Sequence, residues 1–210
     1  MRIPIARDGY RFILPSLVLT ALFAWLYWPV AVVAGTASLF LLFFFRDFER
    51  VTPRIEGAVF SPGDGLVDDI EEVEAAEFPA GRALKVGVFL SLFNCHVTRS
   101  PVAGRVEKIQ YRPGKFHSAM SRRASRVNEC NSIVLDAGGS PVVARQIAGA
   151  IARRIVCTAR IGQRLAPGQR TGLIRMGSRV EVYLPVGSEL RVKKGARVRA
   201  GLSVLAVLKG

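Results

Sequence analysis

The chain has 210 residues, half of them apolar, and its 30 lysines and arginines outnumber its 16 aspartates and glutamates. After a hydrophobic N-terminal stretch about 155 residues remain, which is enough for one well-packed domain and too few for two. The net charge of +14 indicates an anionic partner, and the apolar N-terminus favours a membrane over nucleic acid. A nucleic-acid module would also interleave aromatic and basic residues on a recognisable motif, which this sequence lacks.

The N-terminal stretch has no charged residue between positions 12 and 45. One straight helix of that length would reach about 50 Å, well beyond the ~30 Å hydrocarbon core of a bilayer. Pro29 divides the stretch into residues 12–28 and 30–45, because a helix rarely continues through an internal proline. The pattern predicts a helical hairpin within residues 1–54 that either spans the membrane or dips into one leaflet.

Basic residues flank this hairpin on both sides. They are Arg2, Arg7, Arg11, Arg46, Arg50 and Arg54. The positive-inside rule therefore predicts that both ends lie on the cytoplasmic face of the cell membrane. A cleaved signal peptide is the competing interpretation, but the apolar run is too long for its hydrophobic region and lacks an A-x-A exit site.

Beyond Pro53 the sequence consists of short apolar runs broken by glycine and proline, which is typical of β-strands. We expect strands at residues 58–60, 66–67, 84–92, 133–135, 142–144, 155–159, 180–184 and 202–208. Residues 180–184 alternate apolar and polar side chains, which predicts a strand with one buried face. The sequence leaves open whether residues 146–154 form a short helix or another strand.

A weak internal repeat relates residues 162–168 to residues 195–201, since each reads G-x-R-apolar-x-x-G before an apolar strand. Two such units predict a mainly β soluble domain at residues 55–210, a barrel or sandwich hybrid with quasi-twofold strand pairs. A lipoyl or biotinyl carrier would need a modifiable lysine in a tight hairpin, usually beside methionine. Lys193 and Lys194 lack that setting, so the repeat indicates architecture rather than a carrier function.

The three cysteines, Cys95, Cys130 and Cys157, show neither paired spacing nor a CxxC motif. This pattern is typical of buried thiols in a reducing compartment. The sequence also has no His, Cys and carboxylate cluster with ligand spacing, so we expect no metal.

The dipeptide Gly177-Ser178 comes just before the strand expected at residues 180–184. A serine hydroxyl can attack the preceding glycine carbonyl, because glycine leaves that carbonyl unshielded and tolerates strained backbone angles. Elimination and hydrolysis of the resulting ester would leave a pyruvoyl group, provided that a base and oxyanion donors lie nearby. The dipeptide alone is not diagnostic, because Gly139-Ser140 and Gly187-Ser188 are also present.

Five segments, in order, resemble the motifs of one enzyme family. They are FFRDFER (44–50), SPGDG (61–65), FLSLFNCHVTRSPV (89–102), YRPGKF (111–116) and GQRTGLIRMGSR (168–179). Over nearly its whole length the chain resembles the short bacterial and archaeal type of phosphatidylserine decarboxylase. It departs from the family pattern at Phe48, where proline is usual.

The resemblance implies a proenzyme that cuts itself between Gly177 and Ser178 into chains of residues 1–177 and 178–210, which stay associated. Ser178 would be the nucleophile and the precursor of a covalent pyruvoyl cofactor. Asp64 and His96 would be its activating partners, and an imidazole is a suitable base near neutral pH. His117 lies where the motif does not fix histidine, so we expect it at the surface or filling the core.

The implied reaction converts phosphatidylserine to phosphatidylethanolamine in phospholipid biosynthesis, through a Schiff base with the pyruvoyl group. His96 is the candidate proton donor, and Arg99, Arg112 and Arg179 are unranked candidates to bind the lipid phosphate. The longer bacterial enzymes carry a second histidine where this chain has Arg99, so the sequence leaves open which group is the base in each step.

Two other functions remain open at this point. One is decarboxylation of another serine lipid, such as archaetidylserine. The other is a non-catalytic, membrane-anchored β-domain that binds lipid. The oligomeric state is also left open.

Overall fold

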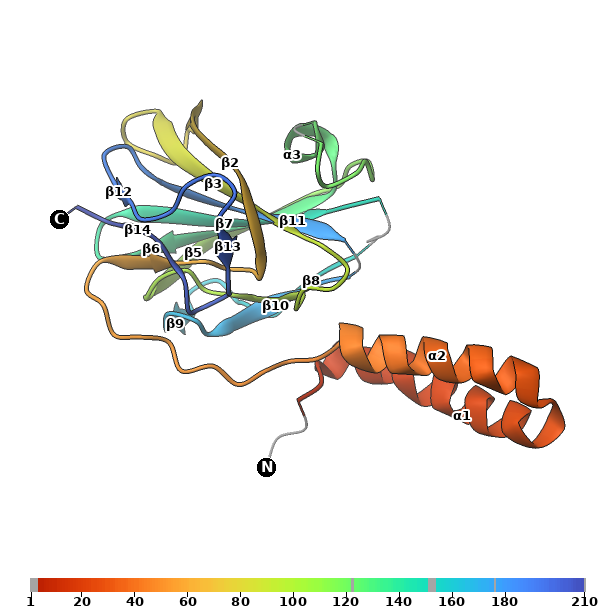
Figure 1. The fold of residues 1–210 in the computed structure, drawn as a ribbon. Helices are drawn as coiled ribbons and strands as arrows, with labels where there is room; N and C mark the ends of the chain where they lie inside the picture. The colour runs from red at the N-terminus through yellow and green to blue at the C-terminus, as the bar shows by residue number, and fades with distance from the viewer. Residues whose placement is uncertain (1–3, 122, 151–153, 176, 210) are drawn as a thin grey trace. The chain divides into compact units, whose positions relative to one another are not determined.

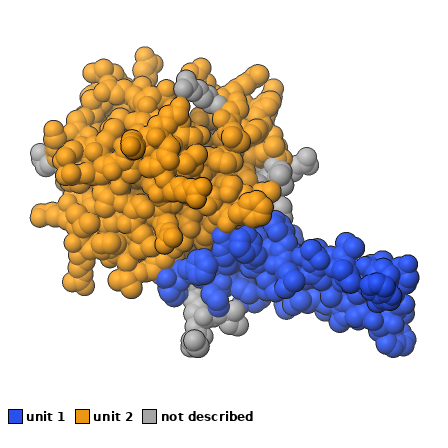
Figure 2. Space-filling model, viewed as in Figure 1, with its two compact units in different colours: residues 1–49 blue, residues 50–210 orange. Residues whose placement is uncertain are grey.

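A computed structural model describes residues 4–121, 123–150, 154–175 and 177–209 (Figure 1). The chain divides into two compact units, residues 1–49 and residues 50–210 (Figure 2). The first unit is helical and the second is mainly β, so the fold class predicted from the sequence is confirmed.

Unit 1 is a hairpin of two apolar helices that pack on each other. The 3-10 turn η1 (Arg7–Gly9) leads into α1 (Tyr10–Leu26), and α2 (Trp28–Phe44) follows. The break falls at Tyr27, whose backbone is extended, and Pro29 occupies the first turn of α2. A proline there costs no intrahelical hydrogen bond, so it starts the second helix instead of interrupting one.

Hydroxyl groups join the two helices inside the hairpin. Ser38 Oγ lies 3.0 Å from Ser16 Oγ and 3.1 Å from Thr20 Oγ1, so these polar groups bond to one another. Among the described helices, residues 7–26 are long and apolar enough to cross a membrane, and α2 is shorter. This rests on length and composition alone.

Unit 2 contains fourteen described strands. They are β1 (Ala58–Phe60), β2 (Gly65–Glu74), β3 (Arg82–Leu90), β4 (Val97–Arg99), β5 (Gly104–Arg112), β6 (Cys130–Asp136), β7 (Pro141–Ala148), β8 (Ile155–Cys157), β9 (Arg164–Leu165), β10 (Arg170–Ile174), β11 (Ser178–Pro185), β12 (Glu189–Leu190), β13 (Arg197–Val198) and β14 (Val204–Val207). A short helix, α3 (Ala124–Val127), lies between β5 and β6. The paired strands are antiparallel. They form an eight-stranded sheet in the order β13-β2-β3-β11-β7-β6-β5-β9, and two three-stranded sheets, β1-β14-β12 and β4-β10-β8.

Every expected run overlaps a strand, but several strands were missed. The longest of these, β5, exposes most of its charged side chains and buries only Val106 fully, so it has no continuous apolar run. In the segment left open between helix and strand, residues 146–148 continue β7, whereas residues 151–153 lie outside the described residues.

The internal repeat corresponds to the two edges of the large sheet. β9 and β13 come from the two repeat units and occupy opposite ends of the strand order. Gly168 and Gly201, which end the units, have φ of 72° and 70°, and a β-carbon on Gly201 would lie 3.0 Å from Gly168 Cα. The sheet therefore curls until these turns meet, and the close approach requires glycine at both positions.

The prediction that β11 buries one face was wrong, because both faces are buried. Val180, Val182 and Leu184 point into the main apolar core. On the other face, Arg179 and Glu181 are buried among charged partners. Alternation of apolar and polar residues in the sequence predicts which face of a strand packs on the core. It does not show whether the polar face is solvated or buried in a charged network, because both give the same sequence pattern.

Candidate active site

Two connections between the same pair of sheets position the candidate site. β3 pairs with β11 in the large sheet, and β4 pairs with β10 in a small sheet. The chain passes from β3 to β4 through residues 91–96 and from β10 to β11 through residues 175–177. Both connections link the same neighbours, and so they run close together and bring His96 to Gly177.

His96 is fully buried at the end of its connection. Its Nδ1 lies 3.0 Å from the carbonyl oxygen of Asn94, and its Nε2 lies 3.3 Å from the backbone nitrogen of Gly177. A carbonyl only accepts and a peptide N–H only donates, so these contacts assign the proton to Nδ1. The Nε2 lone pair of the neutral imidazole therefore faces the Gly177 peptide.

Ser178 begins β11 and is fully buried between Leu90 of β3 and Ala148 of β7. Its Oγ has no hydrogen-bond partner among the described residues. Leaving a buried hydroxyl unpaired costs about 1–3 kcal/mol, and such groups are uncommon in folded proteins. An unpaired hydroxyl at this position is available to attack the peptide bond before it.

The carbonyl of Gly177 rests against a second glycine. Gly177 has a φ of 65°, in the left-handed region that favours glycine. A β-carbon on Gly149 would lie 2.1 Å from the Gly177 oxygen, so a side chain at position 149 would collide with the Gly177 carbonyl. Sequence reasoning missed Gly149, because nothing in the local pattern distinguishes it from an ordinary glycine after a strand.

Asp64 lies in a different set of contacts. Its two carboxylate oxygens accept hydrogen bonds from Arg50 at 2.5 and 2.7 Å, and Oδ1 also accepts one from the Ala200 N–H at 2.7 Å. Arg50 also donates to the Ala200 carbonyl at 2.8 Å. Among the described residues, the hydrogen-bond partners of Asp64 are therefore Arg50 and Ala200, and the expected contact with His96 or Ser178 is not formed.

The three candidate phosphate ligands occupy different environments. Arg99 is buried and donates to the Gly168 carbonyl at 2.8 Å. Arg179 is buried among carboxylates, which favours a structural role over phosphate binding. Arg112 is exposed and donates to the Ser125 carbonyl at 3.1 Å. His117 is half-buried, and its backbone bonds to the Asn128 side chain.

Arg179 and Glu181 form the centre of a buried polar network on the outer face of β11. Arg179 Nε donates to Glu181 at 2.8 Å, and its guanidinium also pairs with Asp68. Glu181 accepts further hydrogen bonds from Ser125 Oγ at 2.5 Å and from Tyr183 OH at 2.7 Å. Burial disfavours the charged form of Glu181, but Arg179 and the hydroxyl donors outweigh it and lower its pKa below the ordinary value.

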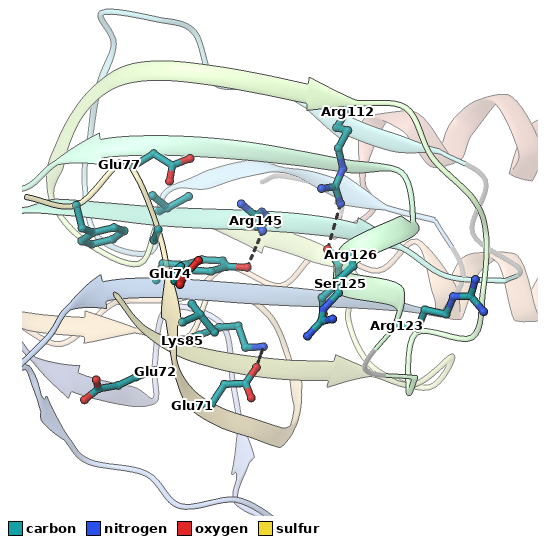
Figure 3. Close-up of a pocket in the computed structure, with 15 residues that line it drawn as sticks. Glu71, Glu72, Glu74, Glu77, Lys85, Arg112, Arg123, Ser125, Arg126 and Arg145 are labelled. Atoms are coloured by element: carbon teal, nitrogen blue, oxygen red, sulfur yellow. Dashed lines mark hydrogen bonds and ion pairs between the residues drawn. The ribbon is translucent and has the colours of Figure 1, made fainter. Parts of the chain in front are cut away.

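A pocket of about 840 Å³ opens on the same outer face (Figure 3). Figure 3 shows glutamates on one side and arginines on the other, namely Glu71, Glu72, Glu74 and Glu77 opposite Arg112, Arg123 and Arg126. Arg145 on the floor donates to Tyr183 OH at 2.6 Å. Successive strand residues point to opposite faces, so Ser178 faces away from this pocket.

Comparison with known proteins agrees with the geometry. The family model for phosphatidylserine decarboxylase matches residues 37–206. The phosphatidylserine decarboxylase proenzyme of Symbiobacterium thermophilum is 46% identical over 211 residues, covering 99% of this chain and 98% of that protein. The protein of the same name from Geotalea uraniireducens is 44% identical over 207 residues, covering 98% and 97%. The chain therefore belongs to the phosphatidylserine decarboxylase family.

Proposed function

We propose that this chain is the proenzyme of a membrane-anchored decarboxylase that converts phosphatidylserine to phosphatidylethanolamine. Its pyruvoyl group would form from Ser178 when the chain cleaves itself after Gly177. The observation that carries the proposal is the buried, unpaired hydroxyl of Ser178, next to the peptide that the lone pair of His96 Nε2 faces. The family membership and the names of the two relatives support the choice of substrate.

The residues present fit the cleavage chemistry. His96 Nε2 would take the proton of the Ser178 hydroxyl, whose oxygen would then attack the carbonyl carbon of Gly177. The amide would become an ester with a free amine on residue 178. Loss of the α-proton would expel the Gly177 carboxylate, and addition of water would release ammonia and leave the pyruvoyl group.

In decarboxylation, a pyruvoyl group supplies an electrophilic carbonyl that takes up the electrons released as CO2 departs. The buried environment of residue 178 would exclude water from that step. His96 is our candidate to deliver a proton to the α-carbon of the product. Among the three candidate phosphate ligands, Arg112 is exposed, but it lines the outer pocket from which Ser178 faces away.

The two products of cleavage would stay together because they share sheets. The segment 178–210 supplies β11, which pairs with β3 on one side and β7 on the other. It also supplies β14, which pairs with β1. We further propose that the hairpin holds the enzyme at the cytoplasmic face of the cell membrane, as the flanking arginines indicate.

The test is the intact mass of the purified full chain under denaturing conditions. We expect pieces of 177 and 33 residues, the second being 210 minus 177, with the smaller piece lighter than its encoded mass by one ammonia. The Ser178→Ala variant should remain one 210-residue chain without decarboxylase activity. An uncut wild-type chain in active membranes, or activity in Ser178→Ala, would rule out the pyruvoyl mechanism and favour a non-catalytic lipid-binding domain.

A further inference from the structure

Two loops border the peptide that would be cleaved. Leu92, in the loop after β3, has a methyl carbon 3.8 Å from the position that a β-carbon on Gly177 would take. Ala119, in the loop after β5, has its β-carbon 3.2 Å from the corresponding position on Gly149, where the Gly177 carbonyl rests. Figure 1 shows both loops at the end of the large sheet where β11 begins.

These loops expose large apolar side chains. Phe93 is 73% exposed, Met120 is 69% exposed and Phe116 is 37% exposed. Single exposed apolar residues are normal on protein surfaces. Here three of them lie on the two short loops that border the Gly177 peptide.

The loop after β5 carries an exposed cation, Lys115, whereas residues 91–95 carry no charged residue. Arg123 and Arg126 follow this loop and line the outer pocket opposite its glutamates. Neither residues 91–102 nor residues 111–128 contain an aspartate or glutamate. Exposed apolar side chains combined with the cation of Lys115 are complementary to the boundary between anionic headgroups and acyl chains in a bilayer.

We infer that the loops at residues 91–95 and 113–121 dock into an anionic bilayer and open the site directly onto it. This inference rests on the proposed function and adds how the substrate arrives. A long-chain phospholipid that left the bilayer would expose its acyl chains to water. A docked site receives the headgroup at Ser178 while the acyl chains stay in the membrane.

A single-tryptophan reporter tests the docking. The chain has two tryptophans, Trp25 and Trp28, both in the hairpin. Phe93→Trp in a Trp25→Phe/Trp28→Phe background, reconstituted as the full chain into phosphatidylglycerol bilayers with brominated acyl chains, should be strongly quenched. Neutralising the loop with Lys115→Gln should weaken that quenching on anionic bilayers.

The matched control is Ile161→Trp in the same background. Ile161 is 66% exposed and next to Gly162, whose N–H bonds to the carbonyl of Val106 near the start of β5, the end away from the two loops. Both reporters share the same hairpin, so anchoring contributes equally to each. Quenching at residue 93 but not at 161 supports docking, whereas equal quenching, or none at either position, would overturn it.

Activity provides a second readout. In Phe93→Ser/Met120→Ser we expect decarboxylation of long-chain phosphatidylserine in bilayers to fall about tenfold, as expected from losing two apolar contacts. Decarboxylation of a short-chain, water-soluble phosphatidylserine should stay unchanged, and Ile161→Ser should match the wild type on both. Equal bilayer rates in the double variant and the wild type would overturn the inference and leave the proposed function intact. A wild type that is inactive on both substrates would instead count against the proposed function.

A second copy of this chain is the alternative occupant of the surface. Light scattering on the detergent-solubilised full chain distinguishes the two cases. An oligomeric state that is the same in wild type and in Phe93→Ser/Met120→Ser supports membrane docking. Dissociation of the double variant into smaller species would assign the surface to contacts between copies and overturn the inference.

Discussion

His96 Nε2 accepts a hydrogen bond from the backbone N–H of Gly177 at 3.3 Å, although 81 positions separate the two residues in the chain. The imidazole is buried, and its other nitrogen is held by the carbonyl of Asn94, so no carboxylate is needed to set the tautomer. This contact places the buried imidazole of His96 beside the peptide that precedes Ser178.

Replacing His96 tests its proposed role as the base directly. We expect His96→Ala and His96→Gln to slow self-cleavage by at least ~100-fold, because neither side chain takes up a proton near neutral pH. The glutamine variant is informative, since its side-chain oxygen can still accept the Gly177 hydrogen bond. A time course of intact mass after synthesis measures the uncut fraction. Maturation of His96→Gln at the wild-type rate would show that His96 only positions the peptide.

Variants that break the ion pair between Arg50 and Asp64 distinguish a structural from a catalytic role for Asp64. Both side chains are largely buried, so Asp64→Asn leaves Arg50 without its carboxylate and should cost about 3 kcal/mol of unfolding free energy. Denaturant unfolding in detergent measures this loss. Arg50→Gln is the matched control, because it breaks the same pair from the other side.

The processing rates of these two variants then decide the role. If Asp64 acts through its ion pair, both variants should be destabilised alike and both should mature more slowly than wild type but faster than His96→Ala. An Asp64→Asn chain that stays uncut while Arg50→Gln matures would show that Asp64 takes a direct part in cleavage.

Substitution of Gly149 tests whether the proposed self-cleavage depends on the position of the Gly177 carbonyl. The β-carbon of Gly149→Ala would collide with the Gly177 oxygen, so we expect a loss of about 1–3 kcal/mol in stability and a strong block of self-cleavage. Cleavage is followed by intact mass at a temperature where thermal unfolding shows the variant to be folded. Gly35→Ala, whose added carbon would make only an ordinary contact at 3.5 Å, should mature normally. Normal maturation of Gly149→Ala would mean that the carbonyl position is not critical.

The lowered pKa of Glu181 predicts a pH-dependent contribution to stability. A carboxyl group whose folded pKa lies below its unfolded value stabilises the protein above the unfolded pKa. That contribution is lost as pH falls through the folded pKa. Glu181→Gln should therefore be less stable than wild type by about 3 kcal/mol at pH 7, because Arg179 loses a buried partner. The difference in unfolding free energy between wild type and Glu181→Gln should narrow when the pH falls below 4.5, the ordinary pKa of a glutamate.

Unfolding free energies measured from pH 7 to pH 3 check this prediction. Glu72→Gln is the control on the same sheet, because Glu72 is half-exposed and pairs with Arg82 at 3.4 Å. It should change stability by less than about 1 kcal/mol at any pH. A gap between wild type and Glu181→Gln that does not vary with pH would show that Glu181 is not ionised in the folded protein.

Local features of the sequence were sufficient to predict the parts of the structure that depend on neighbouring residues. The uncharged run, interrupted at Pro29, predicted the hairpin. Short apolar runs predicted most strands, and the repeated glycine turns predicted quasi-twofold related edges. Sequence motifs also singled out His96 and Gly177, which the structure brings into contact. Each of these signals lies within a few residues or in one motif, and so it can be read without knowing the order of strands in a sheet.

Tertiary structure alone decided which distant groups meet. The pairing of β3 with β11 and of β4 with β10 brings His96 to Gly177, and the fold places Gly149 against the Gly177 carbonyl. The same fold pairs Asp64 with Arg50, whereas the family resemblance implied that Asp64 is an activating partner of Ser178. It also buries Arg179, which in the sequence was indistinguishable from a solvated arginine. Burial and long-range contact depend on what covers a residue, and that cover comes from strands far away in the chain.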